Sequence, residues 1–156
     1  MTNLKKFNRP YSNPIKGDFF ILNIQNDLFH WGRVVSTEAS VGGFDQCVLI
    51  YIYDVVSKDS LTPPKLDVGS LLLPPIATND LVWKRGYFKT VLNLELKPDD
   101  LLQVHCFEDT FLGRYYDDAG SILDRRYEPC GSYALSSYAS IDDKLSEVLG
   151  IALAPE

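Results

Sequence analysis

The pattern of apolar and polar positions predicts a β-hairpin near the start of the chain. Apolar residues dominate positions 19–24 and 28–35, and the polar triplet Gln25-Asn26-Asp27 separates them. Branched and aromatic side chains suit a pleated, half-buried surface, so both runs are predicted to be strands. A short polar connection between two strands favours a hairpin. We therefore expect a hairpin over residues 17–35 to organise the fold, with Asp27 exposed at its tip.

The same pattern predicts further strands along the chain. Residues 47–53 are nearly all apolar or aromatic, which is typical of a central strand buried on both faces. Residues 36–46 are expected to form a loop with a turn at Gly42-Gly43. Residues 57–79, punctuated by proline pairs, are expected to form a long connection that contains one short strand or edge piece. Three more β elements are predicted: a strand pair or bent strand at 80–92, a strand at 101–107 and a second hairpin at 115–123.

The C-terminal segment has helical spacing over about residues 140–150. Its apolar residues fall on one face, Ser140 is a suitable N-cap, and Gly150 is a natural stop. Asp142 and Asp143 would complement the helix dipole from the first turn. We therefore predict an irregular lead-in at 1–16, followed by a single domain at 17–156.

These elements define a fold class. The domain is predicted to be mainly β (α+β), with a bent antiparallel sheet or a small barrel-like sheet, long loops and one C-terminal helix. A doubly wound α/β fold is disfavoured, because predicted helices do not alternate with strands.

Composition and charge narrow the classes of function. The chain has 156 residues, 46% of them hydrophobic, and a net charge of −6. Such acidity disfavours nucleic acid and anionic membranes and suits a basic partner protein. We expect neither a secretory signal nor a membrane span, because the apolar runs are short. The three cysteines, Cys47, Cys106 and Cys130, are widely spaced without a CxxC motif, so reduced cysteines in a cytoplasmic protein are the simplest interpretation.

Residues that could carry catalysis are few. Only His30 and His105 could act as histidine bases, and His105 cannot form a dyad with Cys106 on a strand, because adjacent side chains point to opposite faces. Ligand-type residues gather between 105 and 118 without the spacing of a zinc site, and their acidic pairs suit strand ends and turns. No phosphate-binding glycine motif occurs. We expect no metal and no cofactor.

Aromatic and charged side chains could instead contact a partner protein. Trp31 and Trp83 are of the type enriched in binding hot spots, although core packing is the preferred interpretation for both. Within 30–33, Gly32 is expected to admit another backbone, and Arg33 to orient or pair outside. The residues predicted to bind a partner are Asp27, His30, Arg33, Tyr87, Tyr116, Asp117 and Asp118.

The order of several short motifs resembles a known family. The segment 16–20, KGDFF, followed by 30–35, HWGRVV, resembles the start of immunity protein family twenty-six from bacterial polymorphic toxin systems. The run 48–54, the block 83–88 and the terminal helix from 141 are similar as well. The resemblance implies a β-rich protein that binds and neutralises a cognate toxin. The family is also grouped by name with a small phosphotriesterase.

Three functions therefore stand open. The sequence favours a cytoplasmic immunity protein that occludes a toxin without catalysis, for instance a basic toxin acting in the cytosol. The alternative is a small metal-dependent phosphotriesterase-like hydrolase, for which His30, His105, Asp117 and Asp118 would have to converge. The third is an adaptor module with no toxin partner. The pattern does not define the oligomeric state.

Overall fold

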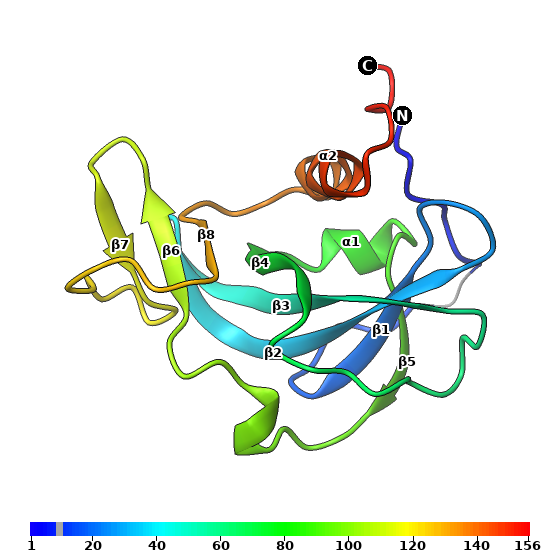
Figure 1. Ribbon diagram of the computed structural model, residues 1–156, viewed down its shortest axis with the longest axis horizontal. Helices are drawn as coiled ribbons and strands as arrows, with labels where there is room; N and C mark the ends of the chain where they lie inside the picture. The colour runs from blue at the N-terminus through cyan, green and yellow to red at the C-terminus, as the bar shows by residue number, and fades with distance from the viewer. Residues whose placement is uncertain (9–10) are drawn as a thin grey trace.

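The computed structural model describes residues 1–8 and 11–156, and in these it contains eight strands, two α-helices and one 3₁₀ helix (Figure 1). The strands are β1 (Asp18–Leu22), β2 (Phe29–Val41), β3 (Phe44–Ser57), β4 (Leu71–Thr78), β5 (Lys89–Asn93), β6 (Cys106–Asp109), β7 (Arg114–Tyr116) and β8 (Cys130–Ser132). The helices are α1 (Leu81–Lys84), the 3₁₀ helix η1 (Pro98–Asp100) and α2 (Tyr138–Leu149). The predicted β-rich fold class with a C-terminal helix is confirmed.

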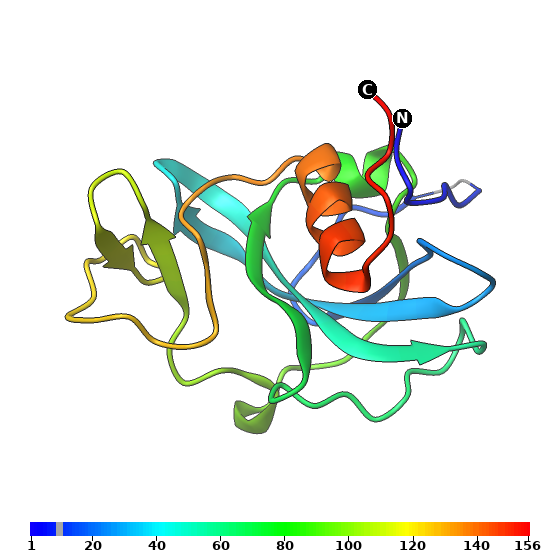
Figure 2. The same cartoon turned by 45° about the horizontal axis from the view of Figure 1, so that its top comes forward.

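Two sheets build the molecule. Five antiparallel strands form a bent sheet in the order β4-β3-β2-β1-β5, so of the two predicted forms the open sheet is present. A second sheet, β7-β6-β8, stands at one end of the first, and its β6–β8 pair is parallel. Helix α2 lies across one face of the large sheet, beside β4 (Figure 2). The large sheet is therefore the element against which both the second sheet and α2 are placed.

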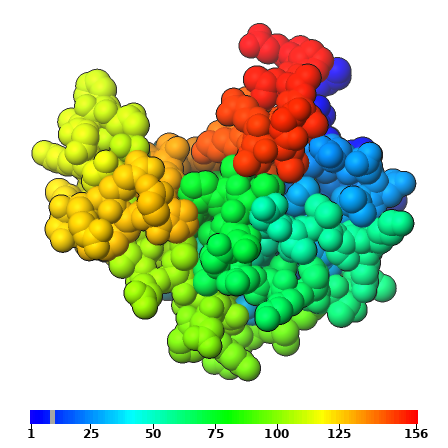
Figure 3. Space-filling view, in the orientation of Figure 1, coloured from blue at the N-terminus to red at the C-terminus, as the bar shows by residue number. Residues whose placement is uncertain are grey.

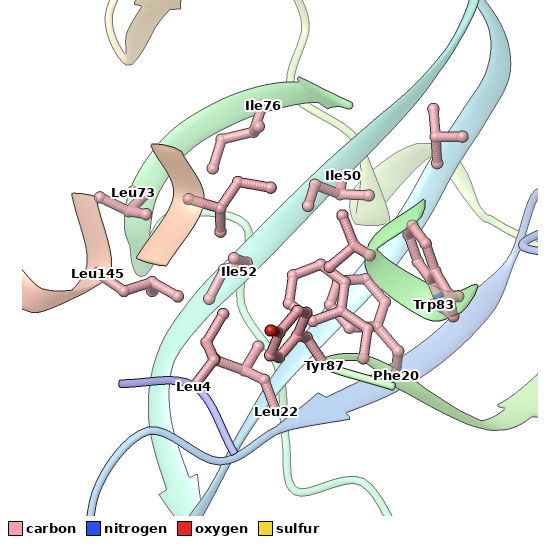
Figure 4. Close-up of a cluster of buried hydrophobic side chains, with 14 of the residues drawn as sticks. Leu4, Phe20, Leu22, Ile50, Ile52, Leu73, Ile76, Trp83, Tyr87 and Leu145 are labelled. Carbon is pink, nitrogen blue, oxygen red and sulfur yellow. The ribbon is translucent and has the colours of Figure 1, made fainter. Parts of the chain in front are cut away.

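Strand β3 is buried on both faces along residues 47–53, as predicted. Ile50 and Ile52 point into a cluster that also contains Trp83 of α1 and Leu145 of α2 (Figure 4). Leu49 and its alternate neighbours enter a second cluster on the opposite face, together with Phe107 of β6. This alternation follows from the two-residue period of a strand. Each fully buried aliphatic side chain contributes about 1.5–3 kcal/mol to the stability of the fold. Strand β3 therefore stabilises the clusters on both of its faces.

The predicted hairpin is confirmed as β1 paired antiparallel with β2. Trp31 is completely buried and packs with Phe19 and Ile21, which confirms its role in the core. A Cβ at Gly32 would collide with the Phe20 ring. The expected close approach at Gly32 is therefore made by an aromatic ring rather than by another backbone.

Three predicted elements are wrong. Residues 36–46 are no loop, because β2 pairs with β3 as far as Val41 and leaves only Gly42-Gly43, both at positive φ, as the turn. Residues 80–92 are no bent strand: α1 ends before Gly86, whose φ of +85° reverses the chain into β5. In 101–107, the strand begins only at Cys106.

The proline-rich connection contains β4 as an edge strand, which agrees with the predicted edge piece. Pro74 and Pro75 fall where the pairing with β3 shifts register between Ile50 and Ile52. Such an irregularity accommodates residues that have no N–H to donate to the ladder. On the outer side of β4, Gly131 of β8 passes so close to the Pro75 carbonyl that a Cβ would not fit.

Helix α2 begins earlier than predicted. Ser137, not Ser140, is the N-cap, and its hydroxyl accepts from the Ser140 N–H at 3.1 Å. Asp142 is buried and accepts from the N–H groups of Asn3 at 3.0 Å and Leu4 at 2.7 Å, rather than complementing the dipole from solvent. Gly150 ends the helix in the left-handed conformation, as predicted.

The Asp142 contacts fix the start of the chain against α2. Positions 9 and 10 of the predicted lead-in lie outside the described residues; the rest of 1–16 forms no helix or strand. Neither α1 nor α2 has the length and apolar composition that a membrane crossing requires.

Truncation of Trp31 tests the hairpin core. We expect Trp31→Ala to lower the free energy of unfolding by about 3–5 kcal/mol, because the ring is fully enclosed and its removal leaves a cavity. Chemical denaturation monitored by circular dichroism measures the loss. Leu61→Ala, at a side chain that is 77% exposed, is the control and should leave the midpoint unchanged. An unaltered midpoint for Trp31→Ala would contradict the core assignment.

Candidate functional site

The predicted contact residues fall into separate regions. Tyr116, Asp117 and Asp118 lie together at the end of β7 in the second sheet. Asp27 is exposed on the β1–β2 turn, at the other end of the large sheet (Figure 1). The structure therefore does not unite all seven residues in one surface.

His30 and Tyr87 lie in the interior. His30 is on β2, and burial lowers the pKa of its imidazole, with the Asp54 carboxylate acting in the opposite direction. The Tyr87 ring stacks on Tyr138 of α2, with ring centroids 5.1 Å apart. In this conformation both side chains serve packing rather than an exposed surface.

Arg33 is buried beneath a hollow of about 300 Å³. Its guanidinium stacks on the Phe19 ring at 4.1 Å, pairs with the Asp100 carboxylate at 3.1 Å and donates to the Leu94 carbonyl at 2.7 Å. The expected pairing is thus present, but it is directed at this chain's own connection from β5 to η1. Because these contacts occupy both terminal nitrogens, Arg33 anchors that connection.

A hydrogen-bonded chain links the core of the large sheet to the second sheet. The Leu102 N–H donates to Tyr51 Oη at 3.1 Å, and Tyr51 Oη lies 2.6 Å from His105 Nε2. The other ring nitrogen, Nδ1, lies 3.4 Å from the Asp118 carboxylate. Tyr51 Oη accepts from the Leu102 N–H, which leaves its own O–H to donate to Nε2 when that nitrogen carries no proton, and burial raises the pKa of Tyr51 to about 12. Nδ1–H then donates to Asp118, and each polar group in this hydrogen-bonded series has a partner.

This series of hydrogen bonds, from Leu102 to Asp118, positions the turn that follows β7. The hydrogen bond from His105 holds the pKa of Asp118 below its ordinary value. Asp117 accepts from the N–H groups of Ala119 and Ser121, each at 2.9 Å, which confirms the predicted turn. Tyr51 is completely buried, so its hydroxyl is not available to a substrate. The only signal for Tyr51 in the sequence is that it and Tyr53 are phenols within the otherwise apolar run 47–53.

The β6–β7 turn exposes apolar side chains that the sequence patterns did not single out. Phe111 is 93% exposed and Leu112 is 54% exposed. The Asp109 carboxylate accepts from both of their N–H groups, at 3.0 and 3.2 Å, and so holds the turn in shape. Nearby, Tyr116 stacks on Tyr133 at 4.0 Å. A turn held by two hydrogen bonds thus presents an aromatic ring to solvent.

A cleft of about 480 Å³ lies between this turn and α2. Figure 3 shows it as the hollow between the yellow-green second sheet and the orange-red α2. Strand β4 forms its floor through Pro74-Pro75, and Thr110, next to Phe111, lies on its wall. Its charged groups are Glu108, Lys144 and Glu147. Burial lowers the pKa of Lys144, whose ammonium donates to the Ser136 hydroxyl at 3.2 Å.

The residues required by the hydrolase alternative do not converge. Within the described part of the chain, no three His, Cys, Asp or Glu side chains are grouped so that they could hold a metal ion. His105 contacts Asp118, whereas His30 is buried on β2, where Asp54 is the carboxylate that acts on it. The proposed set is therefore not assembled.

The structure is a bent antiparallel sheet with a smaller second sheet at one end and an open cleft beside α2. A family model described as Immunity protein 26 matches residues 15–116, which is more than half of the chain, and the chain belongs to this family. The match extends from the start of the hairpin to β7 and includes the Phe111 turn. No curated protein and no solved structure matches the chain.

Removal of the Tyr51 hydroxyl tests the hydrogen-bonded chain. Tyr51→Phe leaves the Leu102 N–H and His105 Nε2 without this partner in a partly buried setting, so we expect the free energy of unfolding to fall by about 1–3 kcal/mol. Urea denaturation measures it. Tyr127→Phe is the matched control, because that phenol donates to Asp124 at the surface, and it should have little effect. Equal effects of the two changes would contradict a special role for Tyr51.

The pH dependence of stability tests the Asp118 contact. A carboxylate with a lowered pKa in the folded state stabilises the fold above its unfolded pKa of 3.8, and that stabilisation is lost as the pH falls through the folded pKa. Asp118→Asn should therefore have a lower melting temperature than the unmodified chain at pH 7, and the difference should shrink below about pH 4. A difference that stays constant from pH 7 to pH 3 would contradict an ionic contribution.

Proposed function

We propose that this chain neutralises a cognate toxin by binding it and covering its working surface, without catalysis. Membership of the Immunity protein 26 family supports an immunity role and implies a toxin as partner. The observation that carries the choice of surface is Phe111, which is almost fully exposed on a braced turn beside the open cleft. We name the surface made by the β6–β7 turn and the adjoining cleft the docking surface.

The docking surface has the properties of a protein-binding site. Exposed aromatic side chains are enriched among residues that dominate binding energy, and a backbone that is already ordered loses less conformational freedom on binding. The Asp109 carboxylate holds the backbone of Phe111 and Leu112 in a defined turn before contact. The projecting β6–β7 turn could insert into a pocket of the toxin, while the adjoining cleft accepts a projecting side chain of the toxin.

Charge supports a basic toxin. The chain has a net charge of −6, and the cleft contains Glu147 and Lys144 together with Glu108, which is paired with Arg126. Carboxylates around an apolar centre accelerate encounter with a positively charged surface and disfavour acidic partners. A basic toxin that acts in the cytosol would meet the immunity protein there, and we propose a cytoplasmic location on this ground.

The interaction is tested with the toxin encoded next to this gene. Co-expression should protect cells from the toxin, and the two proteins should co-purify as one complex. Absence of both protection and binding would overturn the proposal and would favour the adaptor alternative.

The docking surface is tested by paired variants. We expect Phe111→Ala combined with Leu112→Ala to weaken toxin binding at least about tenfold in calorimetry, since removal of a central aromatic anchor costs about 2 kcal/mol or more. The melting temperature should not fall, because both side chains are exposed. Leu61→Ala is the control for loss of an exposed leucine. Unchanged affinity in the double variant would place the toxin contact elsewhere.

A further inference from the structure

Two of the three cysteines face each other across the second sheet. Cys106 of β6 and Cys130 of β8 are direct register partners on parallel strands, and their Sγ atoms lie 3.1 Å apart. Neighbouring strands lie about 4.8 Å apart, within the Cα separation of about 4.4–6.8 Å that a disulfide spans. The wide sequence spacing of the cysteines concealed this pair. Cys47 lies apart, with its thiol directed at the Val41 and Phe44 carbonyls.

The pair is reachable from one side. Cys130 is 9% exposed and lines the 480 Å³ cleft, whereas Cys106 is fully buried behind it. The Tyr127 N–H points at Cys106 Sγ at 3.4 Å, so a backbone donor is in place for a developing thiolate there. Cys130 is therefore the member of the pair that a small molecule in the cleft reaches first, and Cys106 Sγ lies 3.1 Å from Cys130 Sγ, ready to react next.

We propose that Cys106 and Cys130 form a dithiol modification site, at which a peroxide entering the cleft converts the two thiols into an intramolecular disulfide. The proposal is independent of toxin binding. In a reducing compartment both thiols are the resting state, and the disulfide forms on oxidative exposure. Cys47 has no thiol partner among the described residues and does not take part.

The chemistry balances with peroxide as the only co-reactant. The Cys130 sulfur attacks one peroxide oxygen, the O–O bond breaks, and the product is a sulfenic acid and one water. The Cys106 sulfur then attacks the Cys130 sulfur, and the hydroxyl group departs with the Cys106 proton as a second water. Two thiols lose two electrons in total, and the peroxide is reduced by the same two.

Burial limits the rate at which Cys130 reacts with peroxide. Burial, together with the neighbouring Cys106 thiol, raises the pKa of Cys130 to about 12, which keeps its thiolate fraction small at neutral pH. Because the thiolate is the reactive form, the rate should increase with pH through the alkaline range. The proximity of Cys106 nevertheless favours the disulfide over further oxidation once the sulfenic acid exists.

The disulfide would join the two ends of the segment that carries β7, the Asp117–Gly120 turn and Arg126. Arg126 already pairs with Glu108 of β6 at 3.1 Å. A covalent link between β6 and β8 therefore closes this segment into a ring and restricts its opening. The same ring contains Phe111, so oxidation also limits local unfolding of the docking surface.

Mass spectrometry of the full folded chain tests the site. Hydrogen peroxide should remove the mass of two hydrogens, and tryptic digestion without reduction should yield the Cys106 and Cys130 peptides as one linked species. Cys47→Ser should form the same link. Oxygen addition at the exposed Met1 adds mass and is thereby distinguished. Reduction with a dithiol should restore the starting mass.

Stability supplies a second readout. Closing a loop of this length should raise the melting temperature by about 5–10 °C, reversibly on reduction. Cys106→Ser and Cys130→Ser should lose the shift, whereas Cys47→Ser should keep it. A folded chain that takes up only oxygen, or that links Cys47 to either partner, would overturn the proposal. So would a Cys106–Cys130 link found only after denaturation, because the native cleft would then not admit the oxidant.

Discussion

The ladder between β2 and β3 is the contact on which both halves of the molecule depend. These strands have 13 and 14 residues, far more than the usual five or six, and shifts of register bend them along their length. One face of β3 packs in the cluster beneath α1 and α2, and its opposite face packs in the cluster that contains Phe107 of the second sheet. A slip by one residue would exchange the two faces, and Tyr51 would lose His105. Correct register is therefore a condition for the Asp118 turn as well as for the core.

Local patterns predicted the elements whose causes are local. The hairpin, the Gly42-Gly43 turn and the buried strand over 47–53 follow from neighbouring residues alone. Residues 36–40 could not be recognised as strand, because their polar side chains suggest a loop and only pairing with β3 makes them extended. The start of α2 was misplaced although its signal is local, because Ser137 and Ser140 are both possible caps and it is the Ser137 hydroxyl that accepts from the Ser140 N–H. Asp142 has a tertiary role, as the acceptor for the first residues of the chain, so it was misread as a first-turn carboxylate.

The candidate site shows the same division. Tyr116, Asp117 and Asp118 lie together because they border a turn that the sequence defines. Their connection to Tyr51 spans more than fifty positions, and no periodicity reports it. Phe111 was overlooked for the opposite reason: a short turn carries no repeating pattern, and exposure of a phenylalanine is visible only in three dimensions. Cys106 and Cys130 became neighbours through the parallel β6–β8 pair, a connection that an antiparallel prediction does not contain.

The proline pair in β4 has a consequence for how any partner can be recognised. An exposed sheet edge is a common place for a foreign peptide to attach, because it continues the ladder with its own backbone. Pro74 and Pro75 have no N–H, and Gly131 already crowds the Pro75 carbonyl on that side. An incoming strand would find donors missing at successive positions of the cleft floor. The two prolines and Gly131 therefore keep β4 from accepting a further strand here, so any ligand of the cleft would have to be bound through side chains.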